Sequence, residues 1–317
     1  VLQIGIRTDW DSFLRRATPS PRFSVNLLPF QSNRTKLIAS WGIFVQPLKL
    51  SILGPAFDQG RTDVFFDTDG RSPSFGPVSS RFALPDARLS QPRFDVVSLG
   101  WEQSLGANSY LEMNWTRRKE RLGLAYEHAS SDPTEAVYAL RNNRRDYYRS
   151  LQITVRHAFS DKSSLSASYT RSIARTNRII DYSLETLVFT PQQGGPLDWD
   201  APDRLVSSGW APIRLWNLFA SYYFECRSGF PFSVINERQQ VLGQANRLRF
   251  PAYLNLNVGL EKRIRFLKRE WAVRLTILNI TGRENPDSVI NNIDSPDFLR
   301  FGGGQKTAFT ARLRLVG

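Results

Sequence analysis

The chain has 317 residues, of which 42 are Lys or Arg and 29 are Asp or Glu, so its formal charge is +13. Its single cysteine, Cys226, excludes intrachain disulfides, thiolate metal centres and redox chemistry between paired thiols. The longest uncharged stretch has 12 residues, whereas a membrane helix needs about 20 apolar residues. Aromatic residues make up 12% of the chain, and Gly and Pro number 20 and 18, a composition typical of β structure.

Apolar and polar residues alternate at a period of two through most of the chain, which predicts strands with two different faces. The clearest run is Tyr253 to Phe266, where Leu254, Leu256 and Val258 alternate with Asn and Gly. We expect twelve strands, at residues 1–8, 21–30, 36–46, 93–104, 109–127, 147–159, 164–175, 212–225, 230–236, 252–266, 271–281 and 306–316.

The predicted connections after Arg34 alternate between long and short. Long loops at 47–92, 128–146, 176–211, 237–251 and 282–305 are interleaved with tight turns at 105–108, 160–163, 226–229 and 267–270. Transmembrane β-barrels of the outer-membrane type have this arrangement, with turns in the periplasm, loops outside, a lipid-facing apolar surface and a polar lumen. A polar lumen also explains the mean hydropathy of −0.35. The sequence therefore predicts an all-β, antiparallel transmembrane barrel.

Large aromatic residues lie near the ends of the predicted strands, where barrels carry interfacial girdles. The alternative is that they fill the core of a soluble β-sandwich. The residues concerned are Trp101, Trp115, Tyr126, Tyr147, Trp210, Trp216 and Trp271.

Several stretches resemble the barrel of TonB-dependent transporters, in the Oar-like branch. They are IGIRTDW at 4–10, PRFSV at 21–25, TKLIASWGIFVQ at 35–46, WDAPDRL at 199–205, SGFPFSVIN at 228–236, RFPAYLNLNVGLEKRIRF at 249–266 and LNITGRENPDSVINNIDSPDFLRFGGGQKTAFTARLRLVG at 278–317. The resemblance covers nearly the whole chain and is most specific over its last 70 or so residues. One departure is the end of the chain, Leu315, Val316 and Gly317, where the family has a terminal aromatic residue.

The resemblance implies a barrel of about 22 strands filled by an N-terminal plug. Residues 1–317 are then the C-terminal portion of a longer protein, and the plug is absent from this chain. It further implies the outer membrane of a Gram-negative bacterium, energy-coupled uptake of an unknown small ligand, and contact with the TonB complex through the plug. Two alternatives stay open: a passive porin whose twelve strands close alone, and an outer-membrane enzyme.

The residues that could carry chemistry are few. The chain has two histidines and lacks a phosphate-binding Gly-rich loop. His128 has polar neighbours at Ser130, Ser131 and Asp132, but a polar loop often produces such neighbours, and His157 falls on an apolar strand face. We therefore predict no catalytic residue, no metal ligand, no cofactor and no enzymatic activity.

Two acidic clusters fall in predicted loops: Asp63, Asp67 and Asp69 before Gly70, and Asp198, Asp200 and Asp203. Neither matches a full calcium loop, so turn residues are favoured over a calcium site. Aromatic residues accompany both clusters. Such residues can stack on a ligand or pack loop against loop, and packing is favoured because long ordered loops need apolar cores of their own. The predicted ligand contacts in the outer loops are Phe65, Phe66, Trp199, Asp200 and Trp210.

The basic residues are mostly arginine and are spread through strands and loops. A nucleic-acid protein would cluster them on one surface, so no nucleic-acid partner is expected. Arginine binds phosphates well, so outer-membrane lipids and lipopolysaccharide are the expected surroundings at the loop edges. A plain preference for arginine on solvated faces explains the same composition.

Overall fold

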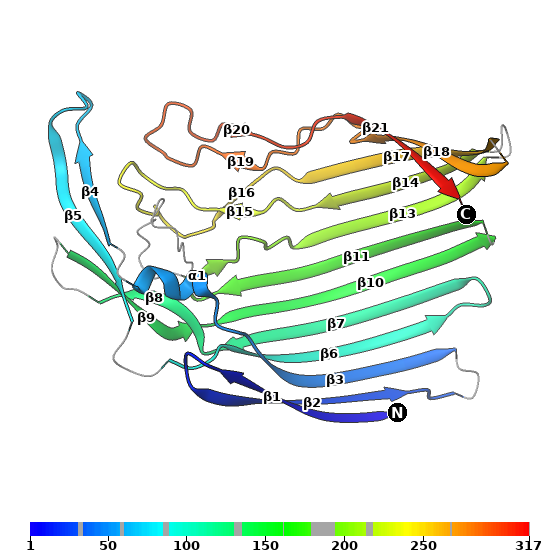
Figure 1. Cartoon of the computed structure of the whole chain (residues 1–317), viewed down its shortest axis with the longest axis horizontal. Coiled ribbons are helices and arrows are strands. Elements are labelled where there is room, and N and C mark those ends of the chain that lie inside the picture. The colour runs from blue at the N-terminus through cyan, green and yellow to red at the C-terminus, as the bar shows by residue number, and fades with distance from the viewer. Residues whose placement is uncertain are drawn as a thin grey trace.

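The computed structural model describes residues 1–30, 34–57, 60–84, 89–129, 135–160, 162–178, 194–213, 218–266 and 268–316. Its main element is one antiparallel sheet in which twelve long strands follow one another across the sheet in chain order (Figure 1). They are β1 (Leu2–Asp11), β2 (Arg16–Leu27), β3 (Thr35–Val45), β6 (Arg93–Ser104), β7 (Ser109–Arg121), β10 (Asp146–Ser160), β11 (Ser163–Thr176), β13 (Asp203–Ile213), β14 (Leu218–Arg227), β17 (Tyr253–Phe266), β18 (Arg269–Leu278) and β21 (Ala308–Val316). The predicted all-β, antiparallel fold of about twelve strands is confirmed.

The sheet is open. Among the described residues, β1 pairs with β2 alone and β21 with β18 alone, and the two strands lie at opposite sides of the sheet. Each therefore presents one edge of unpaired backbone groups. A short strand, β12 (Gly195–Pro196), pairs with the loop end of β11 in antiparallel orientation.

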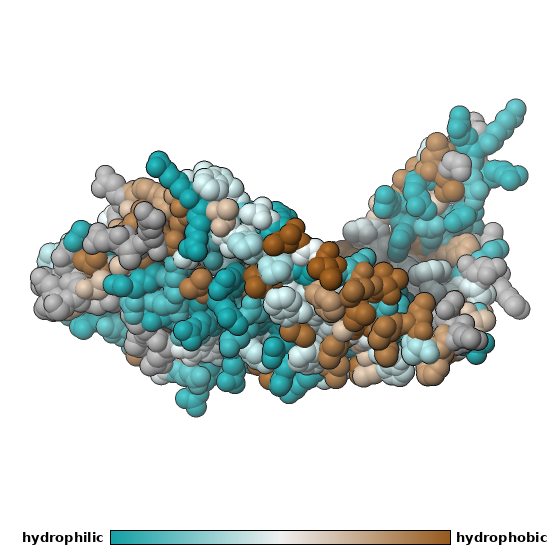
Figure 2. Space-filling model, turned by 90° about the horizontal axis from the view of Figure 1, so that it is seen from below, coloured by the Kyte–Doolittle hydropathy of each residue, from teal (hydrophilic) through white to brown (hydrophobic). Residues whose placement is uncertain are grey.

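The strand registers give the sheet one apolar and one polar face. Directly opposed residues share a face. On the apolar face, Leu205, Cys226 and Leu254 are opposite one another on β13, β14 and β17, and farther along β17 Leu260 is opposite Leu275 of β18. The opposite face carries Asn257 opposite Tyr223, and Thr276 opposite Thr310. Seen from the β1 side, hydrophobic residues gather in a patch right of centre, toward the turns, with hydrophilic residues to its left (Figure 2).

The long connections gather at one end of the strands, called here the loop end, and the tight turns after residue 104 lie at the other, the turn end (Figure 1). Two predicted strand positions are corrected. The region predicted as one strand at 212–225 contains the end of β13 and most of β14. β13 begins at Asp203, within the predicted loop 176–211. The predicted strand at 230–236 lies in a loop. Within it, Pro231–Phe232 (β15) pairs with Leu248–Arg249 (β16), and Ile235 forms isolated bridges to Val241 and Asn292. These two errors offset each other in the strand count.

Two long loops build a second sheet at the loop end. It has the order β4-β5-β9-β8, from β4 (Gly60–Phe66), β5 (Pro73–Ala83), β8 (Gly123–His128) and β9 (Glu135–Arg144), and its β5 and β9 are parallel. Its buried core is formed by Leu124, Leu140 and Leu53, the last residue of α1 (Leu50–Leu53), which is followed by the short 3-10 helix η1 (Gly54–Ala56). A second small pair, besides β15 and β16, joins β19 (Ser288–Val289) to β20 (Phe301–Gly302). In the described part of the chain, no helix has the length and hydropathy required to cross a membrane.

The predicted strand 109–127 is divided by a sharp bend. Leu122 has a φ of 59° and follows the end of β7, while β8 begins at Gly123. A Cβ atom at Gly123 would lie 2.5 Å from the carboxylate of Glu120, so only glycine fits there without displacing that side chain. The bend directs the chain out of the main sheet and into the outer one.

Candidate functional site

A cavity of about 700 Å³ opens on the polar face at the loop end. Its floor comes from β6, β7 and β10, and its rim comes from residues 46–52 and from Leu197 and Trp199. We call it the chamber. The polar face supplies its floor because Phe94, Arg118 and Tyr148 occupy alternate positions on the same side of neighbouring strands.

Arg118 provides the chamber with a positive charge that is not in an ion pair with any described carboxylate. Its guanidinium carbon lies 3.6 Å from the centre of the Phe94 ring, a cation–π contact that holds the side chain in place. The side chain is exposed, and Arg118 makes no ion pair with any carboxylate of the described residues. Lys49, also exposed, lines the same cavity. The chamber is therefore suited to an anionic group.

An aromatic wall faces this charge. Trp199 is 53% exposed, and its ring centre lies 5.5 Å from that of Tyr148 at an angle of 49°. Trp199 is thus held by one ring while most of its surface stays open to a ligand. The arrangement favours a ligand with a flat or apolar part next to an anionic group.

The acidic residues of the chamber are already engaged. Glu120 is buried, and its carboxylate accepts a hydrogen bond from the Asp146 N–H at 3.2 Å. Arg144 donates two hydrogen bonds to the Asp146 carboxylate, at 2.8 and 2.9 Å. These groups shape the wall and leave the accessible charge of the chamber positive.

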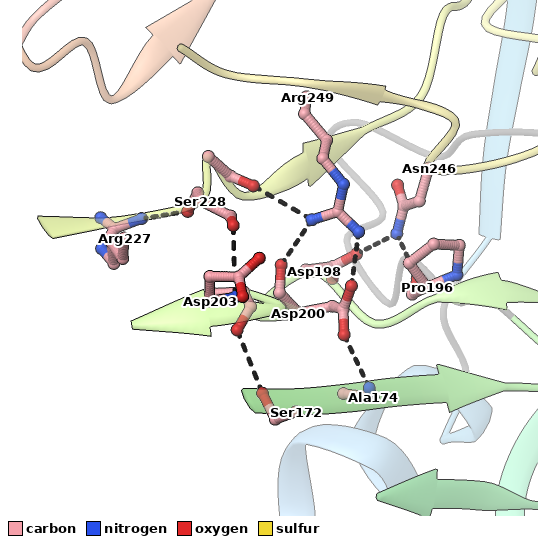
Figure 3. Close-up of polar contacts among 12 residues, drawn as sticks. Ser172, Ala174, Pro196, Asp198, Asp200, Asp203, Arg227, Ser228, Asn246 and Arg249 are labelled. Atoms are coloured by element: carbon pink, nitrogen blue, oxygen red, sulfur yellow. Dashed lines mark hydrogen bonds and ion pairs between the residues drawn. The ribbon is translucent and has the colours of Figure 1, made fainter. Parts of the chain in front are cut away.

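An ion pair between buried Asp200 and partly buried Arg249 fixes the loop that carries Trp199 (Figure 3). Asp200 is 4% exposed; its carboxylate accepts a hydrogen bond from the Ala174 N–H at 2.6 Å and one from the Arg249 guanidinium at 2.5 Å. Arg249 also donates to the Asp200 carbonyl at 2.7 Å and to the Gly229 carbonyl at 3.0 Å. This clasp joins the end of β11 to two loops that are distant in sequence.

Two neighbouring contacts extend the clasp. Asn246 donates from its side-chain amide to Asp198 at 2.6 Å and to the Pro196 carbonyl at 2.9 Å. The backbone also packs tightly next to Arg249, since a Cβ atom at Gly229 would lie 1.7 Å from the Phe250 carbonyl oxygen. The loops behind Trp199 therefore form a rigid support.

The other acidic cluster forms turn and strand contacts. Asp69 accepts hydrogen bonds from the N–H groups of Arg71 and Ser72 and from the Ser72 hydroxyl, at 2.6 to 2.9 Å. The Ser72 hydroxyl, followed by the two backbone N–H groups, lowers the pKa of Asp69. Asp63 pairs with Arg61 at 2.6 Å. Asp69 is thus a solvated turn residue, as the sequence favoured over a calcium site, whereas Asp63 lies within β4 and is partly buried.

The structure separates the five predicted ligand contacts. Trp199 lies at the chamber, and Asp200 lies behind it with its carboxylate engaged by Arg249. Phe65 and Phe66 lie at the end of β4, away from the chamber lining. Phe65 packs on Phe75 with ring centres 5.8 Å apart, whereas Phe66 is 52% exposed. Ligand contact by these residues stays a prediction.

The fifth residue, Trp210, is not in an outer loop. It lies on β13 close to the turn end, opposite Ser164 and Ser221 on the polar face. Its expected position was wrong because the Ser- and Gly-containing stretch 203–211 was assigned to a loop, whereas backbone pairing with β11 and β14 makes it a strand.

The predicted girdle residues also divide. Trp101, Trp115 and Trp271 lie on the apolar face, opposite Met113, Leu151 and Leu315. Tyr126 instead lies in the outer sheet, where its hydroxyl donates to the Ile52 carbonyl at 2.6 Å. Trp216 is outside the described residues.

The histidine candidates gain no catalytic geometry. Ser130, Ser131 and Asp132 lie outside the described residues, as does the side chain of His128. His157 is on the apolar face, as predicted, with its Nδ1 2.7 Å from the Ser109 hydroxyl and its ring against Phe159.

Sequence reasoning missed the floor of the chamber. Phe94, Arg118 and Tyr148 were placed in strands but were not marked as ligand contacts. A signal was present in the sequence, because three neighbouring strands each carry an aromatic or arginine residue near their loop end on the polar face. Recognising that these residues lie together requires the register of the strands, which alternation alone does not give.

Solved structures of bacterial transporters and receptors match the fold over nearly the whole chain. The outer membrane transporter YddB from Escherichia coli matches with a TM-score of 0.70 and 13% identity, over 99% of this chain and 43% of that one. The ferric enterobactin receptor PfeA from Pseudomonas aeruginosa gives 0.68 and 14%, over 98% and 42%. The FrpB iron transporter from Neisseria meningitidis gives 0.58 and 12%, over 95% and 40%.

These comparisons confirm the fold expected from the resemblance to TonB-dependent transporter barrels. The chain spans about two fifths of the length of the matched structures, which are transporters and receptors. No protein-family model and no curated protein matches the sequence.

Proposed function

We propose that this chain is the C-terminal portion of the barrel of an outer-membrane uptake receptor of the TonB-dependent class, and that the chamber receives its ligand. The observation that carries the proposal is the position of the chamber. It lies on the polar face and at the loop end of a sheet whose other face is apolar. In a closed barrel that position is the outward-facing mouth of the lumen.

Completion of the barrel by further strands is part of this proposal. In a lipid bilayer every backbone N–H and C=O group needs a partner within the protein. The outer edges of β1 and β21 need such partners, and the share of the matched structures that the chain spans leaves room for about ten more strands of a 22-stranded barrel. An N-terminal plug would fill the lumen and connect it to the TonB complex.

The ligand class follows from the chamber walls. Arg118 and Lys49 supply positive charge, and Trp199 with Tyr148 supplies an aromatic surface. We expect a small anionic ligand with a planar or apolar part. Arginines at the loop end would meet lipopolysaccharide phosphates, and the apolar face would meet lipid.

Membrane topology gives the first test. In intact Gram-negative cells making the complete gene product, an impermeant thiol reagent should label Arg71→Cys in the β4–β5 turn and spare Asn108→Cys at the turn end. Both sites should react after permeabilisation. Labelling of position 108 with protection of position 71 would show the opposite orientation.

Solute influx distinguishes the receptor from the porin alternative without knowledge of the ligand. Cells with a periplasmic β-lactamase report the entry of nitrocefin across the outer membrane. A plugged receptor should leave nitrocefin entry at the level of cells lacking the protein. Entry well above that level would favour a passive porin.

A further inference from the structure

Positive charge is concentrated on one part of the apolar face. The strand registers place seven cations there, all in the loop-end halves of the four neighbouring strands β6, β7, β10 and β11 (Figure 1). On the rest of this face, the described residues of the long strands include two further cations, Lys262 and Arg269, both near the turn end. The concentration is therefore local. We call it the basic patch; its members are Arg93, Arg117, Lys119, Arg121, Arg149, Arg171 and Arg175.

Two carboxylates balance only part of this charge. Asp95 pairs with Arg121 at 2.5 Å, and Asp203 pairs with Arg171 at 2.5 Å. These are the acidic residues on the apolar face of the described long strands, which leaves an excess of five positive charges. Four exposed cations make no ion pair with a described carboxylate: Arg117, Lys119, Arg149 and Arg175.

The register sets like charges against each other. Arg117 of β7 is directly opposite Arg149 of β10, and Arg93 of β6 is directly opposite Arg121 of β7. Directly opposed residues have Cα atoms about 4.5–5.5 Å apart, and like charges at this spacing destabilise a sheet. Arg121 has Asp95 as its counterion, whereas Arg117 and Arg149 have none among the described residues. An anion between Arg117 and Arg149 would remove their repulsion.

A row of large apolar residues follows the opposed arginines on the side of the turn end. Leu99, Trp115 and Leu151 are opposite one another on β6, β7 and β10. Leu99 and Leu151 are 51% and 38% exposed. Two residues along a strand span about 6–7 Å, so one molecule can contact both rows. The surface suits an amphiphile with an anionic head group and apolar chains.

Phosphate is the anionic group that this arrangement favours. Arginine binds phosphate through two parallel N–H donors, and a phosphate has enough oxygens to accept hydrogen bonds from Arg117 and Arg149 together. The four cations without an ion pair extend over β7, β10 and β11, a width of about 10 Å. This width accommodates a head group with more than one phosphate.

The same strands form the chamber floor with their other face. Arg118 lies between Arg117 and Lys119 in β7, and Tyr148 precedes Arg149 in β10. Because successive side chains point to opposite faces of a strand, the basic patch lies behind the chamber floor. Repulsion between Arg117 and Arg149 therefore weakens the pairing of the two strands that carry Arg118 and Tyr148.

We propose that the basic patch binds the phosphate groups of a phosphorylated lipid in the outer leaflet, and that this lipid stabilises the chamber floor from behind. The inference rests on the proposed function, which places this face in lipid and the loop end outside the cell. The lipid supplies the anion between Arg117 and Arg149, and its chains lie against Leu99 and Leu151.

The first test measures lipid binding to the complete gene product, purified from outer membranes and stripped of native lipid in detergent. Native mass spectrometry should show retention of diphosphorylated lipid A. Removal of both phosphates from the lipid should lower the apparent affinity by about tenfold or more, because the charge-assisted hydrogen bonds are lost. Equal retention of the two lipids would overturn the proposal. Displacement of lipid A by inorganic phosphate would show a site for the free ion and would overturn the lipid as partner.

Neutralisation of the opposed arginines tests the position of the site. Arg117→Gln with Arg149→Gln should weaken lipid A binding by about tenfold or more, since hydrogen bonds to charged groups are the strong ones. Lys262→Gln with Arg269→Gln is the matched control, because it removes two charges from the turn end of the same face and should leave the affinity unchanged. Surface labelling at position 71 verifies that each variant is folded and inserted. Equal losses in the two variants would show that net charge alone attracts the lipid, and would reject the site.

Hydrogen exchange tests the effect on the chamber floor. Lipid A should slow the exchange of amides in residues 116–119 and 147–150 by about two- to fivefold, the size expected when like charges are removed from a cross-strand pair. The Gln variant should show the slow exchange without lipid and no response to lipid A, because its repulsion is already gone. Unchanged exchange in the unmodified protein after lipid A binds would refute the stabilisation of the floor.

The proposed function and the lipid site can fail separately. Labelling of position 108 with protection of position 71 in intact cells would reject the outward orientation of the loop end, and with it the proposed function. Labelling of position 71 together with lipid retention that does not depend on phosphate would reject the lipid site alone.

Discussion

The two ends of the molecule are stabilised in different ways. Of thirteen buried hydrophobic residues among those described, only Phe94, Ala174 and Ala272 lie in the twelve long strands, and the others belong to the loops and the outer sheet. The long strands instead expose large apolar residues such as Leu275 and Phe309, at 58% and 78%. The loop end has the packed core of a small soluble protein, whereas the sheet has none.

The difference shows which forces position the chamber. Backbone pairing holds the strands, and no protein layer of the described residues covers their apolar face. In the proposed barrel, lipid covers that face. Leucine packing and the Asp200–Arg249 clasp hold the loops. The floor of the chamber is therefore held by backbone pairing between the long strands, and its rim is held by side-chain contacts between the loops. Substitutions can weaken the floor or the rim separately.

The largest effect is expected from breaking the clasp. Arg249→Ala leaves the buried Asp200 carboxylate without its cation, which should lower the free energy of opening of these loops by about 3–5 kcal/mol. Hydrogen exchange at the Ala174 amide, which donates to Asp200, reports this opening. Arg204→Ala removes a half-exposed pair and should cost at most about 1 kcal/mol. Similar losses in both variants would contradict the special role of the clasp.

A cavity in the outer core should follow closely. Leu140 is fully buried, so Leu140→Ala should destabilise the outer sheet by about 2–5 kcal/mol. Proteolysis of intact cells should show faster cleavage in this sheet while the long strands stay resistant. Leu242→Ala, at a residue 40% exposed, is the matched control and should change little. Cleavage spreading into the long strands would show that the two ends are not independent.

The apolar face is tested by charge. Leu275→Arg should destabilise the complete protein in lipid vesicles by about 2–4 kcal/mol if its site is near the bilayer midplane, because lipid does not solvate the guanidinium. Thr310→Arg, on the polar face of the neighbouring strand, should be tolerated. Thr310 is a better control than Asn257, whose side chain accepts a hydrogen bond from the Asn279 N–H. Equal destabilisation in urea titrations would reject the assignment of faces.

The smallest effect concerns the turn of the β4–β5 hairpin. The folded pKa of Asp69 lies below the ordinary value of 3.8, so its stabilisation is complete above that value and is lost as the pH falls through the folded pKa. Protection of the Arg71 and Ser72 amides from hydrogen exchange should decline in this acidic range. Asp69→Asn should show no such pH dependence. The same decline in the Asn variant would assign the effect to another group.

The sequence predicts the long strands well because a two-faced strand needs strict alternation. Tyr253–Phe266 agrees with its predicted range of 252–266 to within one residue. Asp203–Ile213 was missed because its apolar face includes Ser207 and Gly209, which weaken the alternation. Conversely, FPFSVIN has the composition of a strand, but its position is set by contacts between loops, such as the Asn291 side chain donating to the Ser233 carbonyl.

The candidate site was harder to predict than the fold. Asp200 and Arg249 are far apart in sequence, and nothing local indicates that they meet. Trp199 was recognised from its aromatic and acidic neighbours, but the same reasoning placed Trp210 beside it, although the two lie near opposite ends of the sheet. Composition identifies residues able to bind, and only strand register separates them.

The parallel pairing of β5 with β9 has a kinetic consequence. Arg81 meets Val137 and Phe82 meets Tyr138 across two loops that are far apart in the chain. Closing such a distant contact in an unfolded chain is slow, because the entropy of the intervening segment opposes it. Once β3, β6, β7 and β10 are paired, both loops emerge from the same side of one sheet, and the search becomes local. The outer sheet is thus expected to assemble last, on a template provided by the long strands.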